Sequence, residues 1–506
     1  MKSSDLQKKF AVGFRSLIIA LLCFMLQTTF ATASHAQSTK ISAKVAKAMA
    51  SGGLQRMILV MSQQADLSGA QQLTSKADKT RYVYETLREM ADSTQPGIVT
   101  ALSQMGLTPT ARLYIQNAIV VTADGGKAID SPAVNSLAAR ADVASIETDD
   151  PITADPLEQL AATGNPPSGI AWNVAWVNAP AVWASGFTGK GIVVGDLDTG
   201  VQWNHPALIN QYRGWNGSSA DHNYNWWDPT TEASPVPIDQ DGHGTATTGI
   251  MVGNDEQGNQ IGVAPGASWI ACRGLGPGAN RSTLLTCLQF MLAPWDLTGA
   301  NPDPSKAPDI VNNSFVCPFC GFQTAFANLR AAGILPVAVP GNFGPTCGSV
   351  FDPGTYPQVL TVGALSYQQN IIAPFSSRGP NTSAPFVVPE IVAPGTTITS
   401  SVPTNAYAVG SGTSFAAPAV SGAVALIWSA RQYLVGNIGE TIQLLQSSAT
   451  PDLSLSCGSS FQPNNLYGYG TLNVATALGI PTGSSASTAS TTQAQTKASL
   501  GSATSW

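Results

Sequence analysis

Short apolar runs alternate along this chain with segments in which apolar residues return every three or four positions. Between residues 37 and 150, the first pattern predicts strands and the second predicts amphipathic helices. The strand candidates are 57–61, 114–122 and 143–146, and the helix candidates are 77–91, 96–106 and 132–139. This order predicts a compact β-α-β-α-β unit with a half-open sheet.

The same alternation continues over a longer part of the chain, residues 171–480. The clearest strand candidates there are 192–194, 309–312 and 334–339, and residues 420–428 are an apolar helix candidate. These strand candidates are apolar throughout rather than at every second position, which is typical of strands buried on both faces of a sheet. The pattern predicts an α/β fold with a doubly wound, mostly parallel sheet and helices on both of its faces.

Three segments depart from this alternation. Basic residues precede an apolar run at 17–25 and are followed by small residues, so 1–36 is interpreted as a signal peptide. The run is shorter than the about 20 residues that span a bilayer, which disfavours a stable membrane anchor. Residues 151–170 are rich in proline and small residues and are predicted to be a linker with a processing site. Residues 481–506 are a low-complexity tail.

Charged residues are sparse in this chain of 506 residues and make up only 11% of it. The net charge is −6. Acidic and basic residues balance in 37–150, whereas acidic residues are in excess from Pro151 onward. No basic cluster marks a nucleic-acid surface, so no nucleic-acid partner is expected.

The cysteines point to an oxidising compartment. One of the seven, Cys23, lies in the expected signal peptide, and the others are Cys272, Cys287, Cys317, Cys320, Cys347 and Cys457. An even number in a secreted chain favours disulfides, with the pairing left open. Cys317 and Cys320 have redox-motif spacing, but no helix start follows to activate a thiol, so a structural disulfide is favoured. With few histidines and no second pair of this spacing, no metal site is predicted.

Two residues supply the base and the acid of a candidate catalytic group. A serine hydroxyl is a poor nucleophile unless a base accepts its proton. His243, between two glycines, is the best base candidate, since His205 and His222 are interpreted as structural or loop residues. Asp198 ends an apolar strand, where doubly wound sheets place their sites, and would orient the imidazole. Asp241, beside His243, is the next-best carboxylate.

The nucleophile candidate is Ser414, which opens a helix whose first N–H groups would face developing negative charge. Asn342, in a glycine-flanked turn after a strand, could donate a further hydrogen bond to an oxyanion. Each motif alone has an ordinary explanation as a turn or a helix cap. Their occurrence together in the order Asp, His, Ser predicts a serine hydrolase.

These motifs resemble those of the subtilisin-like serine proteases. The matching stretches are GIVVGDLDTGVQWNHPAL around Asp198, DGHGTATTG around His243, GNFGP around Asn342 and GTSFAAPAVSG around Ser414. The likeness runs from about Trp172 to Leu478 and is highly specific as a set. The stretch CLQFMLAPWDLTGANPDPSKAPDIVNNSF is similar to the bacillopeptidase F-like branch of this family.

The resemblance assigns roles to the candidate residues of a serine endopeptidase. Ser414 would be the nucleophile, His243 the general base and acid, and Asp198 its orienting partner. Asn342 and the backbone N–H of Ser414 would form the oxyanion hole. Protein or peptide substrates would lie extended and add a strand beside Ser314, Phe315 and Val316. The pocket for the residue before the cut would be lined by Val339, Pro340 and Gly341.

The front unit, 37–150, resembles the family's propeptide by pattern and position. The resemblance implies a secreted, extracellular enzyme made as a zymogen, with its own propeptide as an intramolecular inhibitor and folding aid. Family members often bind structural calcium. No ligand set for calcium can be assigned in this sequence, and no cofactor is required for the expected reaction.

One position departs from the family pattern and leaves room for other functions. Val316 stands where the family usually has glycine at the mouth of the specificity pocket, which predicts a preference for small or slender side chains. A catalytically weak subtilisin-like binding scaffold, processed by another protease, is the alternative. The related serine-carboxyl peptidases would need a Glu base and an Asp at the oxyanion position, and His243 and Asn342 argue against them.

Overall fold

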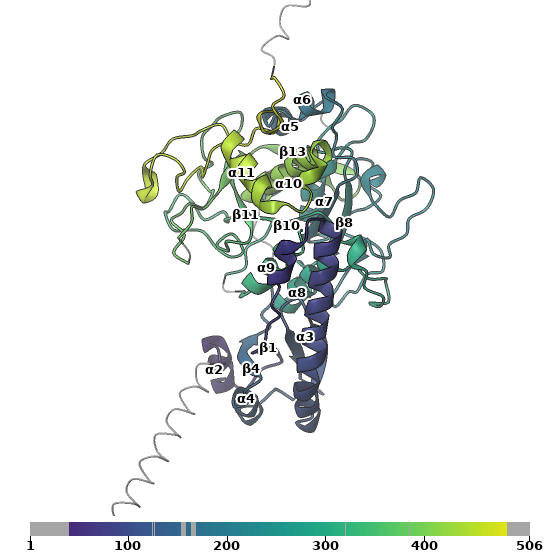
Figure 1. Ribbon diagram of the computed structural model, residues 1–506, viewed down its shortest axis with the longest axis vertical. Helices are drawn as coiled ribbons and strands as arrows, with labels where there is room; N and C mark the ends of the chain where they lie inside the picture. Colours follow the sequence, from purple (N-terminus) through teal and green to yellow (C-terminus); the bar gives the residue numbers. More distant parts are fainter. Residues whose placement is uncertain are drawn as a thin grey trace, which may run out of the picture.

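A computed structural model describes residues 40–123, 125, 127–152, 158–162, 168–318, 320–383 and 385–482 (Figure 1). The expected signal peptide and residues 483–506 of the expected tail lie outside the described residues. A smaller front unit, residues 40–152, stands below a larger unit that begins near residue 168.

The larger unit is built on a sheet of seven parallel strands in the order β12-β11-β10-β9-β6-β8-β7. Its strands are β6 (Val193–Asp198), β7 (Trp226–Trp227), β8 (Ser268–Arg273), β9 (Ile310–Asn313), β10 (Leu335–Ala338), β11 (Leu360–Leu365) and β12 (Ile391–Pro394). In the centre, Val194 of β6 is in register with Trp269 of β8 and Ile310 of β9. The predicted doubly wound α/β fold is confirmed.

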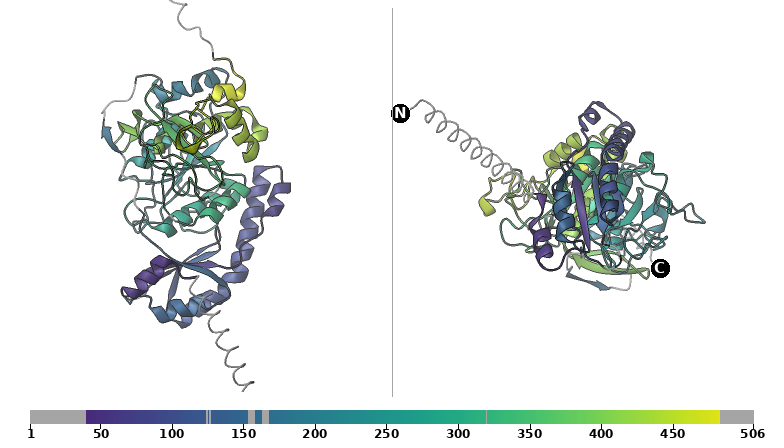
Figure 2. Two further views of the ribbon diagram at one scale, coloured as in Figure 1. Left: turned by 90° about the vertical axis from the view of Figure 1, so that its left-hand side faces the viewer. Right: turned by 90° about the horizontal axis from the view of Figure 1, so that it is seen from below.

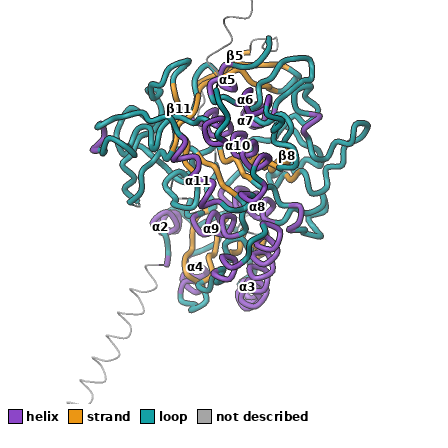
Figure 3. Tube along the Cα trace, turned by 45° about the horizontal axis from the view of Figure 1, so that its top comes forward, coloured by secondary structure: helices purple, strands orange, loops and turns teal. Residues whose placement is uncertain are grey.

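Helices cover both faces of this sheet, and alternate strand residues contact the two layers (Figure 3). Ile310 packs in the cluster with α7 and α10, whereas the next residue, Val311, packs in the cluster with α8 and α9. The α-helices are α5 (Trp172–Trp176), α6 (Ala179–Ala184), α7 (His243–Val252), α8 (Arg281–Leu292), α9 (Gln323–Ala331), α10 (Thr413–Ala430), α11 (Ile438–Ser448) and α12 (Val474–Leu478). Short 3-10 turns are η1 (Ser68–Gln72), η2 (Ile209–Gln211), η3 (Pro304–Lys306), η4 (Gln432–Leu434) and η5 (Ser456–Gly458).

The central helix α10 is longer than the predicted 420–428. Mostly small residues in its first half, 413–419, hide the helix from an apolar pattern. Pro418 lies inside the helix, and the Ser414 carbonyl, which it leaves without an N–H partner, accepts from the Ser314 hydroxyl at 3.0 Å. Among the described residues, α10 alone is long and apolar enough to cross a membrane, and 89% of it is buried inside the protein. That burial is typical of the core helix of a globular unit.

A small antiparallel sheet lies at the edge of the larger unit. It pairs β13 (Ile398–Val402) and β14 (Ala406–Ser411) with β5 (Glu158–Ala162). The predicted linker at 151–170 therefore contains a strand that is added to β14. Leu160 of β5 lies against Gly410 of β14 and against Gly242, which precedes α7.

The front unit has a four-stranded antiparallel sheet in the order β2-β3-β1-β4. The strands are β1 (Arg56–Met61), β2 (Thr108–Leu113), β3 (Ala118–Thr122) and β4 (Val143–Thr148), and the helices are α2 (Ala43–Ala50), α3 (Lys76–Gln104) and α4 (Ser131–Ala138). The predicted β-α-β-α-β order was incomplete, because helix α2 and strand β2 were missed. The strand expected at 114–122 begins only at Ala118, after a turn, and the two helices expected at 77–91 and 96–106 are one helix. Pro96 is tolerated because it and Asp92, whose carbonyl loses its partner, both face solvent.

The front unit packs its sheet and helix α3 on helices α8 and α9 of the larger unit (Figure 2). Val83 and Leu87 of α3 share one buried apolar cluster with Leu288 of α8 and Phe326 of α9. The opposite face of the front sheet, with Leu59, is covered by its own helices. A continuous core therefore joins the two units.

The six cysteines of the larger unit form three disulfides. Cys272 of β8 is bonded to Cys287 of α8, and Cys347 to Cys457. Cys317 and Cys320 are bonded to each other, with their Cα atoms 5.5 Å apart. The predicted disulfides are thereby confirmed, and their pairing is settled in the structure.

Candidate active site

Asp198 and His243 meet where strand β6 ends and helix α7 begins. His243 Nδ1 lies 2.6 Å from Asp198 Oδ1, and the backbone N–H of Thr199 donates to the same oxygen at 2.7 Å. With Nδ1–H donating to the carboxylate, Nε2 carries the lone pair that a general base needs. Gly244 is required beside this contact, since a Cβ there would lie 2.1 Å from the carbonyl oxygen of Gly200.

A second carboxylate, that of Asp239, holds the turn that presents His243. Its Oδ1 accepts from the Thr199 hydroxyl at 3.0 Å and from the Gly242 N–H at 2.8 Å. Its Oδ2 accepts from the N–H and the hydroxyl of Thr245 at 2.9 and 2.6 Å. The Thr199 hydroxyl in turn accepts from the N–H of Gly244 at 2.9 Å. Asp239 therefore joins the Asp198 strand to the first turn of α7 on both sides of His243.

Sequence reasoning missed this role of Asp239 and weighed Asp241 instead. Asp241 is exposed, and its backbone N–H donates to Asp239 at 3.0 Å. A signal was present, because an Asp four residues before a Gly-flanked His can cap the turn that follows.

Ser414 lies in the first turn of α10 and is buried, as is His243. Phe415, the next residue, packs edge-on against the His243 ring with centroids 6.2 Å apart. The Ser414 hydroxyl donates to the Ser314 carbonyl at 3.4 Å, and the Ser314 hydroxyl donates to the Ser414 carbonyl at 3.0 Å. The described contacts contain no hydrogen bond from Ser414 Oγ to His243, and such bonds often tighten only with substrate.

Asn342 is fixed next to the start of α10 by its side-chain oxygen. Asn342 Oδ1 accepts from the N–H of Thr413 at 2.8 Å and from its hydroxyl at 3.0 Å. This leaves Nδ2 to donate, and that atom would be 3.6 Å from a Cβ at Gly412. The amide donor and the N–H groups of the first turn of α10 therefore occupy the same corner of the site.

The predicted substrate-binding residues follow two neighbouring strands, β9 and β10. Ser314, Phe315 and Val316 are all buried after β9. Phe315 packs towards the α8 side of the sheet, whereas Val316 packs towards the other side in the same cluster as Val339. Pro340 and Gly341 continue from Val339, and the Gly341 carbonyl is held by the N–H of Ser377 at 3.0 Å. The structure thus places Val316 and Val339 on one side of the sheet.

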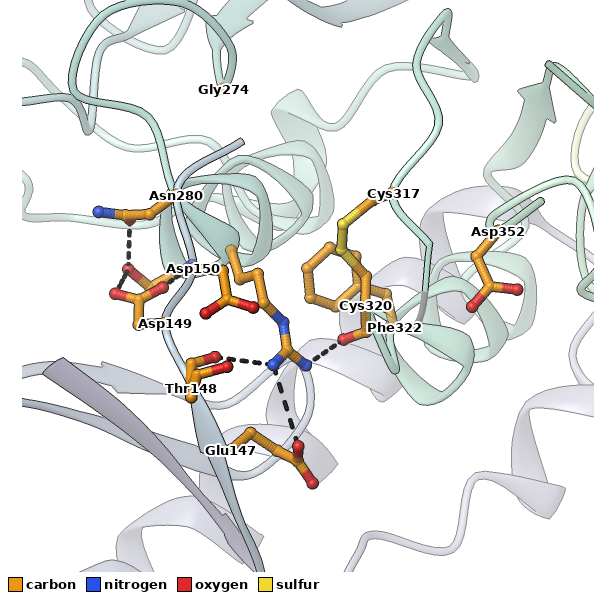
Figure 4. The surroundings of a disulfide bond; sticks show 12 residues. Glu147, Thr148, Asp149, Asp150, Gly274, Asn280, Cys317, Cys320, Phe322 and Asp352 are labelled. Atoms are coloured by element: carbon orange, nitrogen blue, oxygen red, sulfur yellow. Dashed lines mark hydrogen bonds and ion pairs between the residues drawn. A yellow bond between two sulfur atoms is a disulfide. The ribbon is translucent and has the colours of Figure 1, made fainter. Parts of the chain in front are cut away.

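A third segment near the site, Ala279–Arg281, was missed from the sequence. The last residues of the front unit run antiparallel to it. Ile152 N–H donates to the Ala279 carbonyl at 3.1 Å, and Arg281 N–H donates to the Asp150 carbonyl at 3.0 Å. Arg281 Nη1 donates to the Thr148 carbonyl at 2.7 Å and lies 4.0 Å from Glu147 Oε2, and its Nη2 donates to the Cys320 carbonyl. Figure 4 shows Thr148 and Glu147 on the side of this site that faces the Cys317–Cys320 disulfide. The glycines of 274–278 were the available signal for a loop that accepts another backbone.

Burial and charge act in opposite directions on the central pair. Burial raises the pKa of Asp198, whose Oδ2 has no hydrogen-bond partner in the described structure, and the charge of His243 lowers it. Burial also raises the pKa of Asp196, two residues earlier, to about 7. For His243, burial lowers the pKa. The carboxylates of Asp198, Asp196 and Asp241 together raise it by more than burial lowers it, so the net pKa lies above its ordinary value.

Comparison with known proteins places these residues in a family. The sequence profile of the Subtilase family matches residues 189–470, more than half of the chain. The chain belongs to the subtilase family. The predicted resemblance, including the bacillopeptidase F-like branch, is thereby confirmed.

Three relatives show the range of the match. The subtilase is 41% identical over 324 residues to Bacillopeptidase F of Bacillus subtilis (strain 168), covering 60% of this chain and 22% of that protein. It is 33% identical over 277 residues to the Major intracellular serine protease of that strain, covering 54% of this chain and 78% of the relative. It is 30% identical over 312 residues to Subtilisin E of that strain, covering 60% and 70%.

The family and these relatives support a serine endopeptidase. The chain spans only 22% of the length of Bacillopeptidase F. None of the matched residues in the family profile belongs to the front unit, because the profile begins at residue 189.

The acid limb of the pH profile should lie above the ordinary histidine pKa of 6.5. A protonated His243 cannot accept the Ser414 proton, so kcat/KM of the processed enzyme should fall as pH is lowered through the raised pKa. Asp196→Asn removes one of the three carboxylates that raise the pKa of His243 and should move the limb to lower pH. A half-maximum at or below pH 6.5 in the parent enzyme would contradict the electrostatic account.

Asp239→Asn should lower kcat by about 10–100-fold with a smaller change in KM, because it loosens the turn that positions His243. Steady-state kinetics on one peptide substrate measure the split, and thermal unfolding checks that the fold is kept. Asp241→Asn, two residues away and exposed, is the matched control. Because the Asp241 carboxylate also raises the pKa of His243, both variants are compared at a pH above the acid limb, where Asp241→Asn should keep kcat near the parent value. Parental kcat in a stably folded Asp239→Asn enzyme would show that the turn needs no such support.

Proposed function

We propose that this subtilase is a secreted serine endopeptidase that cuts protein or peptide substrates through an acyl-enzyme. The observation that carries the proposal is the buried contact of His243 Nδ1 with Asp198, beside Ser414 at the start of α10. Protein and peptide substrates follow from the peptidase family.

In the proposed reaction, Ser414 Oγ attacks the substrate carbonyl carbon while His243 Nε2 takes its proton. The oxyanion accepts hydrogen bonds from Asn342 Nδ2 and the N–H of Ser414. His243 then gives its proton to the leaving amine, which breaks the peptide bond and leaves an ester on Ser414. A water molecule hydrolyses the ester by the same proton transfers in reverse. Asp198 stays ionised and stabilises the imidazolium.

We further propose that the enzyme is made as a zymogen, with the front unit as its propeptide and intramolecular inhibitor. Ser414 and His243 are only 2% exposed in the uncut chain. Residues 150–152 pair with Ala279–Arg281, and β5 pairs with the strand that leads to Ser414. Backbone pairing with both flanks of residues 153–157, which lie outside the described residues, supports processing within the 151–170 segment.

The proposal includes export of the enzyme and assigns no calcium site. The apolar segment at 17–25 and the three disulfides support extracellular localisation. In the residues that the structure covers, no group of three His, Cys, Asp or Glu side chains is placed to hold a metal ion. We therefore assign no calcium ligands to this chain.

Ser414→Ala should reduce peptide hydrolysis by at least about 10⁴-fold and stop processing of the 151–170 segment. A fluorogenic peptide measures the first effect, and N-terminal sequencing of the purified chain measures the second. Ser429→Ala, at the other end of α10, is the control and should retain both. Hydrolysis that survives in Ser414→Ala would overturn the proposed nucleophile, and processing that survives would assign the cut to another protease.

Val316 should restrict the pocket for the residue before the cut, because its side chain lies on the same side of the sheet as Val339. The parent enzyme should prefer small or slender side chains, and Val316→Gly should raise relative kcat/KM for Phe by about tenfold or more. Peptides that differ only at this residue measure the ratio. Fastest cleavage after Phe or Tyr by the parent enzyme would refute the restriction.

A further inference from the structure

The first turns of helix α3, residues 76–80, contact the larger unit at a place separate from the active site. Further along α3, Val83 and Leu87 enter the apolar cluster shared with α8 and α9. Figures 1 and 2 show the long helix rising from the front unit along the side of the larger unit. We call residues 76–80 the α3 arm.

Three polar side chains of the α3 arm bind the larger unit directly. Lys76 Nζ lies 2.9 Å from Asp309 Oδ1 and donates to the Ala307 carbonyl at 2.8 Å. Lys79 Nζ donates to the Gly436 carbonyl at 3.1 Å, and the Thr80 hydroxyl donates to the Ala332 carbonyl at 2.9 Å. These acceptors come from three segments of the larger unit, so the arm binds a preformed surface rather than one loop.

The ion pair of Lys76 with Asp309 is largely shielded from water. The two side chains are only 14% and 12% exposed. Asp309 is itself held in place, because its Oδ2 accepts from the Val193 N–H at 2.8 Å. Removing one member of such a pair leaves the other charge without its partner in a poorly solvated place, which is costly.

Glycines in the larger unit make room for the lysine stem. A Cβ at Gly436 would lie 2.8 Å from the Lys76 Cβ, and one at Gly333 would lie 3.3 Å from the Lys76 Cγ. Both glycines have positive φ, so their turns also favour glycine. The surface therefore fits the α3 arm closely in shape as well as in charge.

This contact lies at the far end of the sheet from the catalytic residues. Asp309 binds Val193, the first residue of β6, whereas Asp198 is the last residue of the same strand. At about 3.3 Å per residue, the two ends are about 17 Å apart. A substrate at the active site would therefore leave the arm contact untouched.

We propose that the α3 arm is a second anchor of the front unit, and that its polar contacts set how long the front unit stays bound after the 151–170 segment has been cut. The proposal rests on the zymogen function proposed above. The α3 arm and the other contacts of the front unit reinforce each other. While one contact holds, the other re-forms at high effective concentration after it opens. Detachment of the arm would then set the length of the delay between cutting and activity.

The test compares Lys76→Met with Arg81→Met in the full-length chain. Arg81 lies on the same helix, and its side chain is 62% exposed and paired with Asp78 of α3 itself. Gel analysis follows cutting, a fluorogenic peptide follows activity, and size-exclusion chromatography follows the cut front unit. Lys76→Met should shorten the delay between cutting and activity about tenfold or more, with earlier separation of the two units, whereas Arg81→Met should match the parent.

A parental delay in a Lys76→Met chain that is cut at the normal rate would overturn the anchor. If Lys76→Met does not fold, Thr80→Val, which removes one hydroxyl donor, should shorten the delay less but measurably, and an unchanged delay there counts equally against it. Failure of the zymogen proposal would look different, because the uncut parent chain would then already hydrolyse the fluorogenic peptide. Once fully separated, the parent and both α3 variants should have equal kcat/KM.

Discussion

The buried contact between an imidazole and a carboxylate sets the requirements that the surrounding subtilase structure meets. Removing both groups from water disfavours their charges, so the pair needs donors and a rigid frame. Strand β6 supplies Asp198 at its carboxyl end, and the N–H of Thr199 donates a hydrogen bond that stabilises the negative charge of its carboxylate. The loop bound by Asp239 supplies the frame. Ser314 and Asn342 come from the corresponding ends of β9 and β10, which is where parallel sheets gather functional loops.

The parallel sheet could be predicted from the sequence because its strands are short, continuous apolar runs. Prediction failed where structure depends on partners distant in the chain. Strand β2 has alternating exposed positions and becomes a strand only by pairing with β3. Helix α3 continues through Pro96 because the lost hydrogen bond faces water.

The same limit applies to the site. Asp198, His243, Ser414 and Asn342 stand in motifs that are visible locally. The structure joins Asp198 to His243, and Asn342 to Thr413 beside Ser414. Asp239 could not be chosen over Asp241 from the sequence, since only the fold shows which carboxylate points inward. The Asp239 carboxylate accepts from five donors, which are the Thr199 hydroxyl, the N–H groups of Asp241 and Gly242, and the N–H and hydroxyl of Thr245. Strand β5 was hidden in a segment whose composition is that of a linker, because its partner β14 lies far along the chain.

The disulfide between β8 and α8 has a consequence for the enzyme's own survival. Cys272 and Cys287 enclose the glycine-rich loop that carries exposed Pro277 and Gly278 and leads to Ala279. An endopeptidase at high concentration attacks exposed loops of its neighbours. A nick inside this loop would open the backbone, but the disulfide would still hold both fragments in one covalent molecule. The loop can therefore be accessible to another backbone without becoming the point at which self-digestion takes the catalytic unit apart.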